Sequence, residues 1–428
     1  MAPRDLSVAL LGCGTVGSEV VRLLAERRDD FAARCGANLN LVGIAVRDLS
    51  AERPAHVPTE LLTTDAEALV RRADLVIELI GGIEPARSLI LAALASGASV
   101  VTGNKALLAA HGPELHEATA EADVDLYYEA AVAGAIPIVY TLRESLAGDH
   151  VETVMGIVNG TTNYILDNMT QAGVGYEEAL AAAQELGYAE ADPTADVEGH
   201  DAAAKLAIMA ALAFHSRVAL DDVPVQGISH ITAEDIAEAR ESGHTIKLLA
   251  TARRLGTEGI SLRVAPTLVA DSHPLASVGG AYNAVVTESE AAGRLMFYGQ
   301  GAGGAPTASA VLSDVVAAAA HRVVGGLAPR ELRYASLPVL GTDRERGVFS
   351  VALHASDESG VLSAVAGAFA EHGVSIRSVH QDDSTGEGSA RVRIVVHETT
   401  RAALDDVVAA LADHPKVKSV PRVMPVEG

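Results

Sequence analysis

The chain is poor in cysteine, and that shortage excludes two classes of structure. Only two cysteines occur in 428 residues, Cys13 and Cys35, and neither belongs to a Cys-x-x-Cys pair or a Cys/His cluster. A secreted fold held by disulfides and a zinc site built on thiolates are therefore not expected. A reducing cytoplasm suits such a chain.

Positive charge is also scarce. The chain carries 32 Lys and Arg against 56 Asp and Glu, a formal net charge of -24. A surface with this balance repels phosphate backbones and anionic lipid headgroups, so nucleic acid is not an expected partner. An anionic cofactor can still bind, because backbone N–H groups and one or two cations dominate the field inside a cleft.

Long apolar runs are missing as well. The most apolar stretch, residues 206–214, is shorter than the roughly 20 residues that cross a bilayer, and it is predicted to be a buried core helix. The N-terminus begins Met-Ala-Pro-Arg-Asp and lacks a basic segment followed by an apolar one and a cleavage site. We therefore expect a cytoplasmic protein that contacts no membrane.

The composition that remains is that of a large globular chain. Hydrophobic residues make up 49% and charged residues 21%, and 428 residues exceed what one core organises, so two or three domains are expected. Residues 1–134 alternate short apolar runs with amphipathic stretches, which predicts an α/β domain with a Rossmann-type, doubly wound parallel sheet. Its strands are expected at residues 7–11, 39–46, 75–79 and 99–102, each ending at the sheet edge where such folds bind ligands.

Three further segments follow this domain. Residues 135–304 mix strands and helices and predict an α+β catalytic and dimerisation domain, after which an alanine-rich helix within 305–330 returns to the first domain. Residues 331–346 contain Pro338, Gly341 and several charges, which indicates a linker. Residues 347–428 follow the order βαββαβ, which is typical of a ferredoxin-like domain.

A glycine motif, GCGTVG at residues 12–17, follows the first strand and opens a helix, the context that a GxGxxG phosphate-binding loop requires. Gly12 permits the tight turn, Gly14 lets the backbone approach a pyrophosphate, and Gly17 allows close packing of helix against strand. The alternative is a glycine turn in an unrelated α/β protein. The expected cofactor-binding residues of this loop are Gly12, Gly14, Thr15, Val16 and Gly17.

The end of the second strand bears on the choice of cofactor. Sites for NAD usually place an acidic residue there to bind the ribose hydroxyls, and here Arg47 stands before Asp48. A guanidinium can pair with a 2′-phosphate, which favours NADP. NAD is the alternative, if Arg47 is only solvated and Asp48 binds the ribose.

Lysine occurs at only five positions, so a lysine inside an apolar or glycine-rich motif needs a reason. Lys105 follows Thr102 by three residues at the carboxyl end of a strand, within reach of a nicotinamide. Lys205 lies four residues after Asp201, on one helical face, and an apolar helix continues from it. A buried ammonium needs a paired carboxylate, and such a pair can transfer protons. The alternatives are a surface lysine at a helix start and an ordinary surface salt bridge.

Several motifs together resemble one family. They are GCGTVG (12–17), TGNKALLA (102–109), YYEAAVAGAIPI (127–138), GIVNGTTNYIL (156–166), AQELGYAEADPTADVEGHDAAAKLAI (183–208) and GQGAGGAPTASAV (299–311). The combination is similar to homoserine dehydrogenases, in the monofunctional bacterial form that ends in a regulatory ACT domain. The resemblance covers essentially the whole chain, and the aspartate-rich segment that ends at Lys205 is its most discriminating part.

The resemblance implies reversible, NAD(P)-dependent interconversion of L-homoserine and L-aspartate 4-semialdehyde, a step toward threonine and methionine. Lys205 is the expected proton donor, Asp201 is expected to orient Lys205 and contact the substrate, and Lys105 is expected to hold the reacting oxygen or relay the proton. The substrate-binding residues that the resemblance implies are Glu190, Asp196 and Asp192, and the further cofactor-binding residues are Thr102, Lys105 and Gly303.

The resemblance also implies an ion and an effector. A structural sodium ion is expected near Glu129, Val132, Gly134 and Ile136, although Glu129 could merely cap a strand end. Threonine, the implied end product, is expected to bind the ACT domain near Asp357 and Gly360, and the enzyme is expected to be a homodimer or homotetramer. Glu358-Ser359 stands where that family often has Arg-Pro, so a domain used only for pairing is the alternative.

Two other functions fit the sequence less well. A semialdehyde dehydrogenase that forms a thioester would need a cysteine nucleophile, yet Cys13 lies in the phosphate loop and Cys35 near the end of the first crossover. A sensor that binds nucleotide and amino acid without turnover would have no use for the acidic segment that ends at Lys205.

Overall fold

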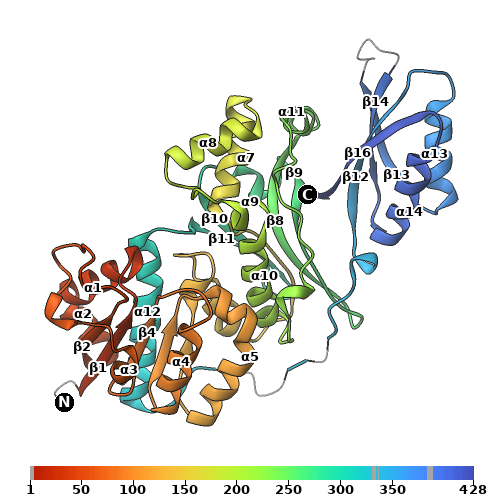
Figure 1. Ribbon diagram of the computed structural model, residues 1–428. Helices are drawn as coiled ribbons and strands as arrows, with labels where there is room; N and C mark the ends of the chain where they lie inside the picture. Colours follow the sequence, from red (N-terminus) through yellow and green to blue (C-terminus); the bar gives the residue numbers. More distant parts are fainter. Residues whose placement is uncertain (1–3, 330–333, 336, 383–388) are drawn as a thin grey trace. The chain divides into compact units, whose positions relative to one another are not determined.

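The computed structural model describes residues 4–329, 334, 335, 337–382 and 389–428 (Figure 1). The chain divides into two compact units. The first comprises Met1–Gly160, Asp201–Asp222 and Ala281–Ser336, and the second comprises Thr161–His200, Val223–Gly280 and Leu337–Gly428. Each unit therefore draws on segments that are far apart in the sequence.

The first unit contains a six-stranded sheet in the order β3-β2-β1-β4-β5-β6, and every pair in it is parallel. This confirms the predicted doubly wound sheet. Its central strands are almost wholly buried because helices cover both faces, which explains their continuous apolar sequences. In sheet order the strands are Leu62–Thr63, Ala37–Ala45, Arg4–Leu11, Leu75–Glu78, Ser99–Thr102 and Leu126–Tyr127.

Six helices accompany this sheet: α1 (Thr15–Glu26), α2 (Arg28–Cys35), α3 (Ala66–Val70), α4 (Ala86–Ala95), α5 (Lys105–Ala122) and α12 (Gly304–Val324). Helix α12 is the predicted return helix, and it begins five residues earlier than the alanine-rich segment 309–324. By length and composition alone α12 could cross a membrane. Instead Ala308, Val311 and Val315 are fully buried in the core that the strands of this sheet also form, so it is a core helix.

The first unit also carries the elements that surround Lys105 and Lys205. Strands β7 (Val151–Ile157), β10 (Tyr282–Ser289) and β11 (Gly293–Gln300) form antiparallel pairs, with β10 in the middle. Helix α10 (His200–Ala213) is buried along its length except at His200 and Ala211, which confirms the predicted core helix. The short elements η2 (Glu129–Ala131), α6 (Ile138–Tyr140), the π-helical turn η3 (Thr141–Ser145) and η4 (Leu220–Asp222) complete the unit.

The second unit is built around an antiparallel pair, β8 (His244–Leu255) and β9 (Gly259–Ala270). Its helices are α7 (Gly160–Ala172), α8 (Tyr176–Glu185), α9 (Thr194–Val197), η5 (Pro274–Ser277) and α11 (Ala233–Glu241). Thr232 begins α11 with a capping box, since its hydroxyl accepts the Asp235 N–H while the Asp235 carboxylate accepts the Thr232 N–H.

The C-terminal segment has the predicted ferredoxin-like βαββαβ order, and its strands lie in the order β16-β12-β14-β13. Phe349, Leu353 and Phe369 are fully buried in its core. The serine- and glycine-rich turn expected after β13 lies outside the described residues. The elements are η6 (Thr342–Arg344), β12 (Arg346–Ser356), α13 (Val361–Glu371), β13 (Ile376–Asp382), β14 (Ser389–Val396), β15 (Thr399–Thr400), α14 (Arg401–Ala412) and β16 (Val417–Glu427).

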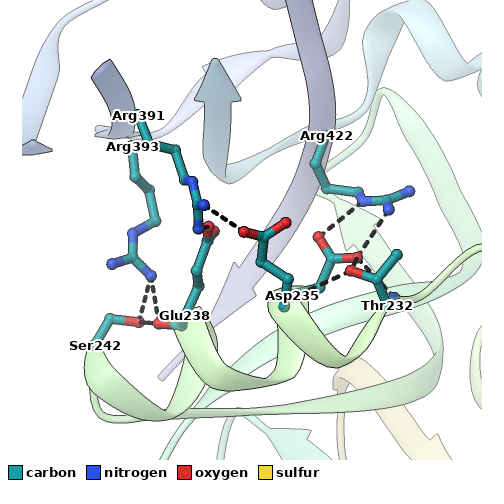
Figure 2. Close-up of polar contacts among 8 residues, drawn as sticks. Thr232, Asp235, Glu238, Ser242, Arg391, Arg393 and Arg422 are labelled. Carbon is teal, nitrogen blue, oxygen red and sulfur yellow. Dashed lines mark hydrogen bonds and ion pairs between the residues drawn. The ribbon is translucent and has the colours of Figure 1, made fainter. Parts of the chain in front are cut away.

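Strand pairing and side-chain contacts fasten this C-terminal domain within the second unit. At its last residues β16 pairs in parallel with β9, Val426 opposite Leu268 and Glu427 opposite Val269. In addition, arginines of β14 and β16 contact α11, as Figure 2 shows. Of the expected linker 331–346, residues 331–333 and 336 lie outside the described residues, whereas Val339 bridges to Ile260 of β9.

Candidate active site

The glycine loop has the geometry of a phosphate cradle. A Cβ added at Gly12 would lie 2.6 Å from the Leu79 carbonyl oxygen, and one added at Gly17 would lie 2.3 Å from the Gly12 carbonyl oxygen, so larger residues cannot fit at either position. At Gly14, by contrast, no atom of the described chain lies within 4 Å of such a Cβ. Gly14 begins α1 without a side-chain cap, which leaves the first N–H groups of the helix available to an anion.

The residues after β2 are arranged so that an arginine faces solvent. The Asp48 carboxylate accepts hydrogen bonds from the Ser50 N–H (2.8 Å) and hydroxyl (2.7 Å), and these bonds lower the pKa of Asp48. Arg47 beside it is exposed. Arg53, which the sequence analysis did not select, donates to the Asp48 carbonyl at 2.6 Å, and its charge acts on Cys13 in the glycine loop.

Buried polar groups shape the ends of β4 and β5. The Thr102 hydroxyl donates to the buried Glu78 carboxylate at 2.6 Å, so the side chain of Thr102 is committed to a structural contact. Asn104 caps α5, because its side-chain oxygen accepts the Leu107 N–H at 3.1 Å, and this cap places Lys105 in the first turn of the helix.

Gly303, the other expected cofactor residue, directly precedes α12. Its neighbour Gly304 lies against the glycine loop, since a Cβ added there would be 3.1 Å from the Thr15 carbonyl oxygen. Gly303 has a φ of 122°, a backbone conformation that other residues rarely adopt. The start of α12 at Gly304 thus lies against Thr15 of the glycine loop, and Gly303 is the residue directly before it.

Asp201 joins the two selected lysines. Its Oδ1 lies 2.5 Å from Lys105 Nζ and its Oδ2 lies 2.6 Å from Lys205 Nζ. Asp201 and Lys205 are each 8% exposed. Burial alone would raise the pKa of Asp201, but the charges of Lys205 and Lys105 hold it well below its usual value. The ordinary surface salt bridge is therefore excluded for this pair.

The turn after β7 completes this cluster. The Val158 carbonyl accepts a hydrogen bond from Lys205 Nζ at 2.7 Å, and Asn159 Nδ2 donates to Asp201 Oδ2 at 2.9 Å. Asn159 was not among the residues predicted from the sequence, although it lies in the motif GIVNGTTNYIL (156–166). Its position 42 residues before Asp201 gives no local signal, and only the contact of the turn after β7 with α10 brings the two together.

In the acidic loop of the second unit, only some of the predicted substrate-binding residues belong to a polar cluster. Thr161 donates to the Tyr188 carbonyl at 2.6 Å and to the Asp196 carboxylate at 3.3 Å, which gives this loop one polar cluster. Asp192 is exposed, and its carboxylate accepts bonds from the Thr194 N–H and hydroxyl, which is a local turn. Glu190 is also exposed.

In the expected cation loop, backbone N–H groups engage the carboxylate of Glu129. The carboxylate of Glu129 accepts the N–H groups of Val139 (2.9 Å) and Tyr140 (2.7 Å), so it caps the following helical turns. Gly134 has a positive φ of 58°, and a Cβ added there would lie 2.5 Å from the Gly301 carbonyl. Within the described chain, no group of three or more His, Cys, Asp or Glu side chains could hold a metal ion.

One orphaned oxygen fits a cation in this neighbourhood. Asn283 lies so close to Gly301 that a Cβ added at Gly301 would meet its side-chain amide, and Asn283 Oδ1 is buried without a hydrogen-bond partner among the described residues. An oxygen that is desolvated and unpaired is costly unless a proton or a cation meets it. The donor set near Gly134 is thus compatible with a hard cation held by neutral oxygens.

Comparison with known proteins accounts for the whole chain. Family models match for the homoserine dehydrogenase NAD-binding domain (residues 12–129), for homoserine dehydrogenase (137–316) and for the ACT domain (349–415). The homoserine dehydrogenase of Corynebacterium glutamicum is 53% identical over 428 residues, covering 99% of this chain and 96% of that protein.

Solved structures agree with these matches. A homoserine dehydrogenase from Thiobacillus denitrificans superposes with a TM-score of 0.94 at 37% identity, covering 100% of this chain and 99% of that one. A hyperthermophilic archaeal homoserine dehydrogenase in complex with NADPH has a TM-score of 0.64 at 25% identity, covering 76% of this chain and 100% of that one. With its NAD-binding domain, its catalytic domain and its ACT domain all matched, the chain belongs to the homoserine dehydrogenase family.

Proposed function

We propose that this oxidoreductase interconverts L-homoserine and L-aspartate 4-semialdehyde in the cytoplasm, with NADP as its preferred cofactor. The observation that carries the proposal is the buried carboxylate of Asp201, which bridges Lys105 and Lys205. Two ammonium groups on one carboxylate leave the cluster with a net positive charge, which suits a site where an alkoxide forms.

In the reducing direction a reduced nicotinamide, when bound, would supply a hydride for the aldehyde carbon, which leaves the C=O electron pair on the oxygen. That oxygen then takes a proton from Lys205. An ammonium has three N–H bonds, and the contacts with Asp201 and Val158 use two of them, so the third can point to substrate. Lys105 stabilises the developing negative charge on the same oxygen. In the oxidising direction the neutral Lys205 amine takes the hydroxyl proton.

The substrate's amino group is assigned to Glu190 and Asp196. The exposed carboxylate of Glu190 and the Asp196 carboxylate, which also accepts from Thr161, offer acceptors for an ammonium group. The self-contained turn of Asp192 supports a role in shaping this loop rather than in touching substrate.

NADP preference rests on the Arg47 and Asp48 pair. Because the Asp48 carboxylate is engaged by Ser50, it competes poorly for ribose hydroxyls, while the exposed guanidinium of Arg47 is available to a 2′-phosphate. The cofactor pyrophosphate is assigned to the N–H groups at Gly14 and the start of α1.

A structural sodium ion is proposed at the carbonyls of Glu129, Val132, Gly134 and Ile136. These backbone oxygens, with no thiolate or imidazole among them, suit a hard monovalent cation. Its role would be to hold the positive-φ turn at Ala133 and Gly134, and no chemical step passes through it.

Threonine is the proposed effector of the ACT domain. Gly360 begins α13 with a φ of 86°, and a Cβ added there would lie 3.5 Å from Lys416 Nζ. Lys416 can bind the carboxylate of an amino acid and the exposed Asp357 its ammonium group.

A homo-oligomer is proposed through the edge strand β11, whose side chains alternate between half-buried and exposed, including the exposed Met296 and Tyr298. A strand edge with exposed large side chains suits pairing with a second copy.

The test of the activity is NADP reduction, followed at the NADPH absorbance band, with purified enzyme, homoserine, sodium and alkaline buffer. Turnover that depends on homoserine is expected. Tight binding of NADP without turnover would instead favour the sensor function. The thioester alternative is disfavoured because Cys35 is buried and Cys13 lies in the phosphate loop.

A further inference from the structure

We propose that Asn159 is a positioning residue for proton transfer, because its side-chain amide fixes the Asp201 carboxylate so that one oxygen faces each lysine. The inference rests on the proposed function, in which Lys205 exchanges the proton. It gives a role to the turn between β7 and α7, none of whose side chains the mechanism uses.

The turn supplies one acceptor and one donor in succession. The carbonyl of Val158 accepts from Lys205 Nζ at 2.7 Å, and the next residue, Asn159, donates to Asp201 Oδ2 at 2.9 Å. Asp201 Oδ2 therefore receives two donors, Asn159 and Lys205, while Oδ1 receives Lys105. Asn159 is itself buried, so water does not substitute easily for its amide.

Without that amide the carboxylate would have a rotational choice. The last torsion of an aspartate is broad and two-fold, so the ion pairs alone do not fix the plane of the carboxylate. A donor held on one oxygen removes this freedom, and it also aims the remaining N–H of Lys205, because the same turn holds that ammonium through Val158.

The turn itself cannot shift easily. A Cβ added at Gly160 would lie 2.7 Å from the Ala281 carbonyl oxygen, so the backbone passes close to the segment that enters β10. Ile157, two residues before Asn159, is paired with Ala284 of β10. A backbone held on both sides places the Asn159 amide within a narrow range.

A neutral donor suits this place. The charged groups that face Asp201 are Lys105 from α5 and Lys205 from α10, and Asn159 faces it from the turn. A third cation at this position would compete with both lysines for the Asp201 carboxylate. A carboxylate there would repel Asp201 from a hydrogen-bond distance. The amide holds Asp201 without competing for its charge.

The experiment compares Asn159→Asp and Asn159→Ala with wild type, and it uses Gln171→Glu as the control. Gln171 is exposed at the far end of α7, so its variant adds a similar charge without touching the cluster. Rates of homoserine oxidation are measured across pH, NADPH affinity by fluorescence, and folding by melting temperature.

Asn159→Ala is expected to lower kcat at least tenfold with NADPH affinity within about twofold of wild type. Asn159→Asp places two carboxylates together, one of which takes up a proton, so the acidic limb of kcat/KM should move to higher pH by about one unit. Gln171→Glu should leave both unchanged.

Two results would overturn the proposal. If both Asn159 variants keep the wild-type kcat and pH profile, the amide does not position Asp201. If Asn159→Ala lowers the melting temperature and the NADPH affinity as well as kcat, Asn159 supports the fold instead. Both of these results would leave the proposed function intact. A wild-type enzyme that is inactive toward homoserine would refute the proposed function itself.

Discussion

Lys205 is a buried ammonium that shares its carboxylate with a second lysine, and this arrangement predicts the effect of replacing it. Lys205→Ala is expected to lower kcat by about 10²–10⁴-fold, the usual contribution of a general acid or base. Cofactor affinity should stay unchanged, because the proton moves in the transition state. Lys205→Arg should be equally impaired, since a guanidinium keeps the charge but does not release its proton. The measurement is steady-state kinetics with homoserine and NADP, together with NADPH titration. A kcat above about a tenth of wild type in either variant would reject the assignment.

Arg47 is the residue on which cofactor choice is expected to depend. Arg47→Ala should raise the KM for NADP while leaving that for NAD near its original value, because only NADP carries the 2′-phosphate. Arg53→Ala is the informative comparison, since Arg53 holds the Asp48 carbonyl and should affect both cofactors alike. Kinetics with each cofactor check both variants. An equal loss with NADP and NAD in Arg47→Ala would assign Arg47 a structural role.

The residues that the sequence predicted share a local signal, and the missed ones lack it. Asp201 and Lys205 are four positions apart on one helix, in a chain with few lysines, so their pairing could be predicted. Asn159 and Arg53 act through contacts that depend on how a turn lies against a distant helix or loop. The hydrogen bond from Thr102 to Glu78 could not be predicted for the same reason, because the two residues lie on neighbouring strands.

At the scale of elements, two substitutions in the glycine loop are expected to affect cofactor binding and stability separately. Gly14→Val should abolish binding of NADP and NAD with little change in melting temperature, because its Cβ meets nothing in the described chain yet occupies the cofactor's path. Gly17→Ala should lower the melting temperature, because its Cβ would overlap the Gly12 carbonyl. Calorimetry and cofactor titration measure the two effects. A Gly14→Val protein that binds NADPH normally would place the pyrophosphate elsewhere.

Elements with regular apolar patterns were predicted within a few residues, whereas their ends depended on tertiary contacts. Strand β5 and the start of α1 fall where the sequence placed them. Strand β16 runs on to Glu427, because its last residues pair with β9. No local pattern indicates that pairing, since Pro421 and Arg422 interrupt the apolar alternation.

At the scale of the whole chain, the ACT domain is joined to its unit through buried charge. Arg263 on β9 is 8% exposed and pairs with Glu345 and with Glu427, both of which lie in or beside the ACT domain. Burial lowers the pKa of Arg263 to about 10. Deleting the chain after Thr342 would remove both carboxylates and leave a buried cation unpaired, a change that typically costs about 3–5 kcal/mol.

The truncated enzyme is therefore expected to be insensitive to threonine but to melt at a lower temperature than the full chain. Adding Arg263→Met should recover part of that loss, because an apolar side chain of similar length needs no partner. Melting temperature and threonine inhibition of the three proteins test this. A truncated enzyme as stable as the full chain would mean that water or neighbouring carboxylates satisfy Arg263.

The contact between the ACT sheet and α11 offers an effector signal a route out of the ACT domain. Arg391 pairs with Glu234 and, at 2.6 Å, with Glu238, while Arg422 holds Asp235 at 2.8 and 3.2 Å (Figure 2). These ion pairs are partly buried, and Asp235 also caps α11, so a movement of the ACT sheet acts on a helix that leads into β8.

Arg391→Glu sets a carboxylate against Glu234 and Glu238 and should loosen this contact. The expected result is a threonine concentration for half inhibition raised about 5–150-fold, the range of typical allosteric couplings, with the uninhibited kcat unchanged. Arg377→Glu, an identical charge change at an exposed position of the same sheet, is the control and should not alter inhibition. Activity against threonine concentration is measured for the three proteins. If Arg391→Glu is inhibited as strongly as wild type, α11 does not carry the signal.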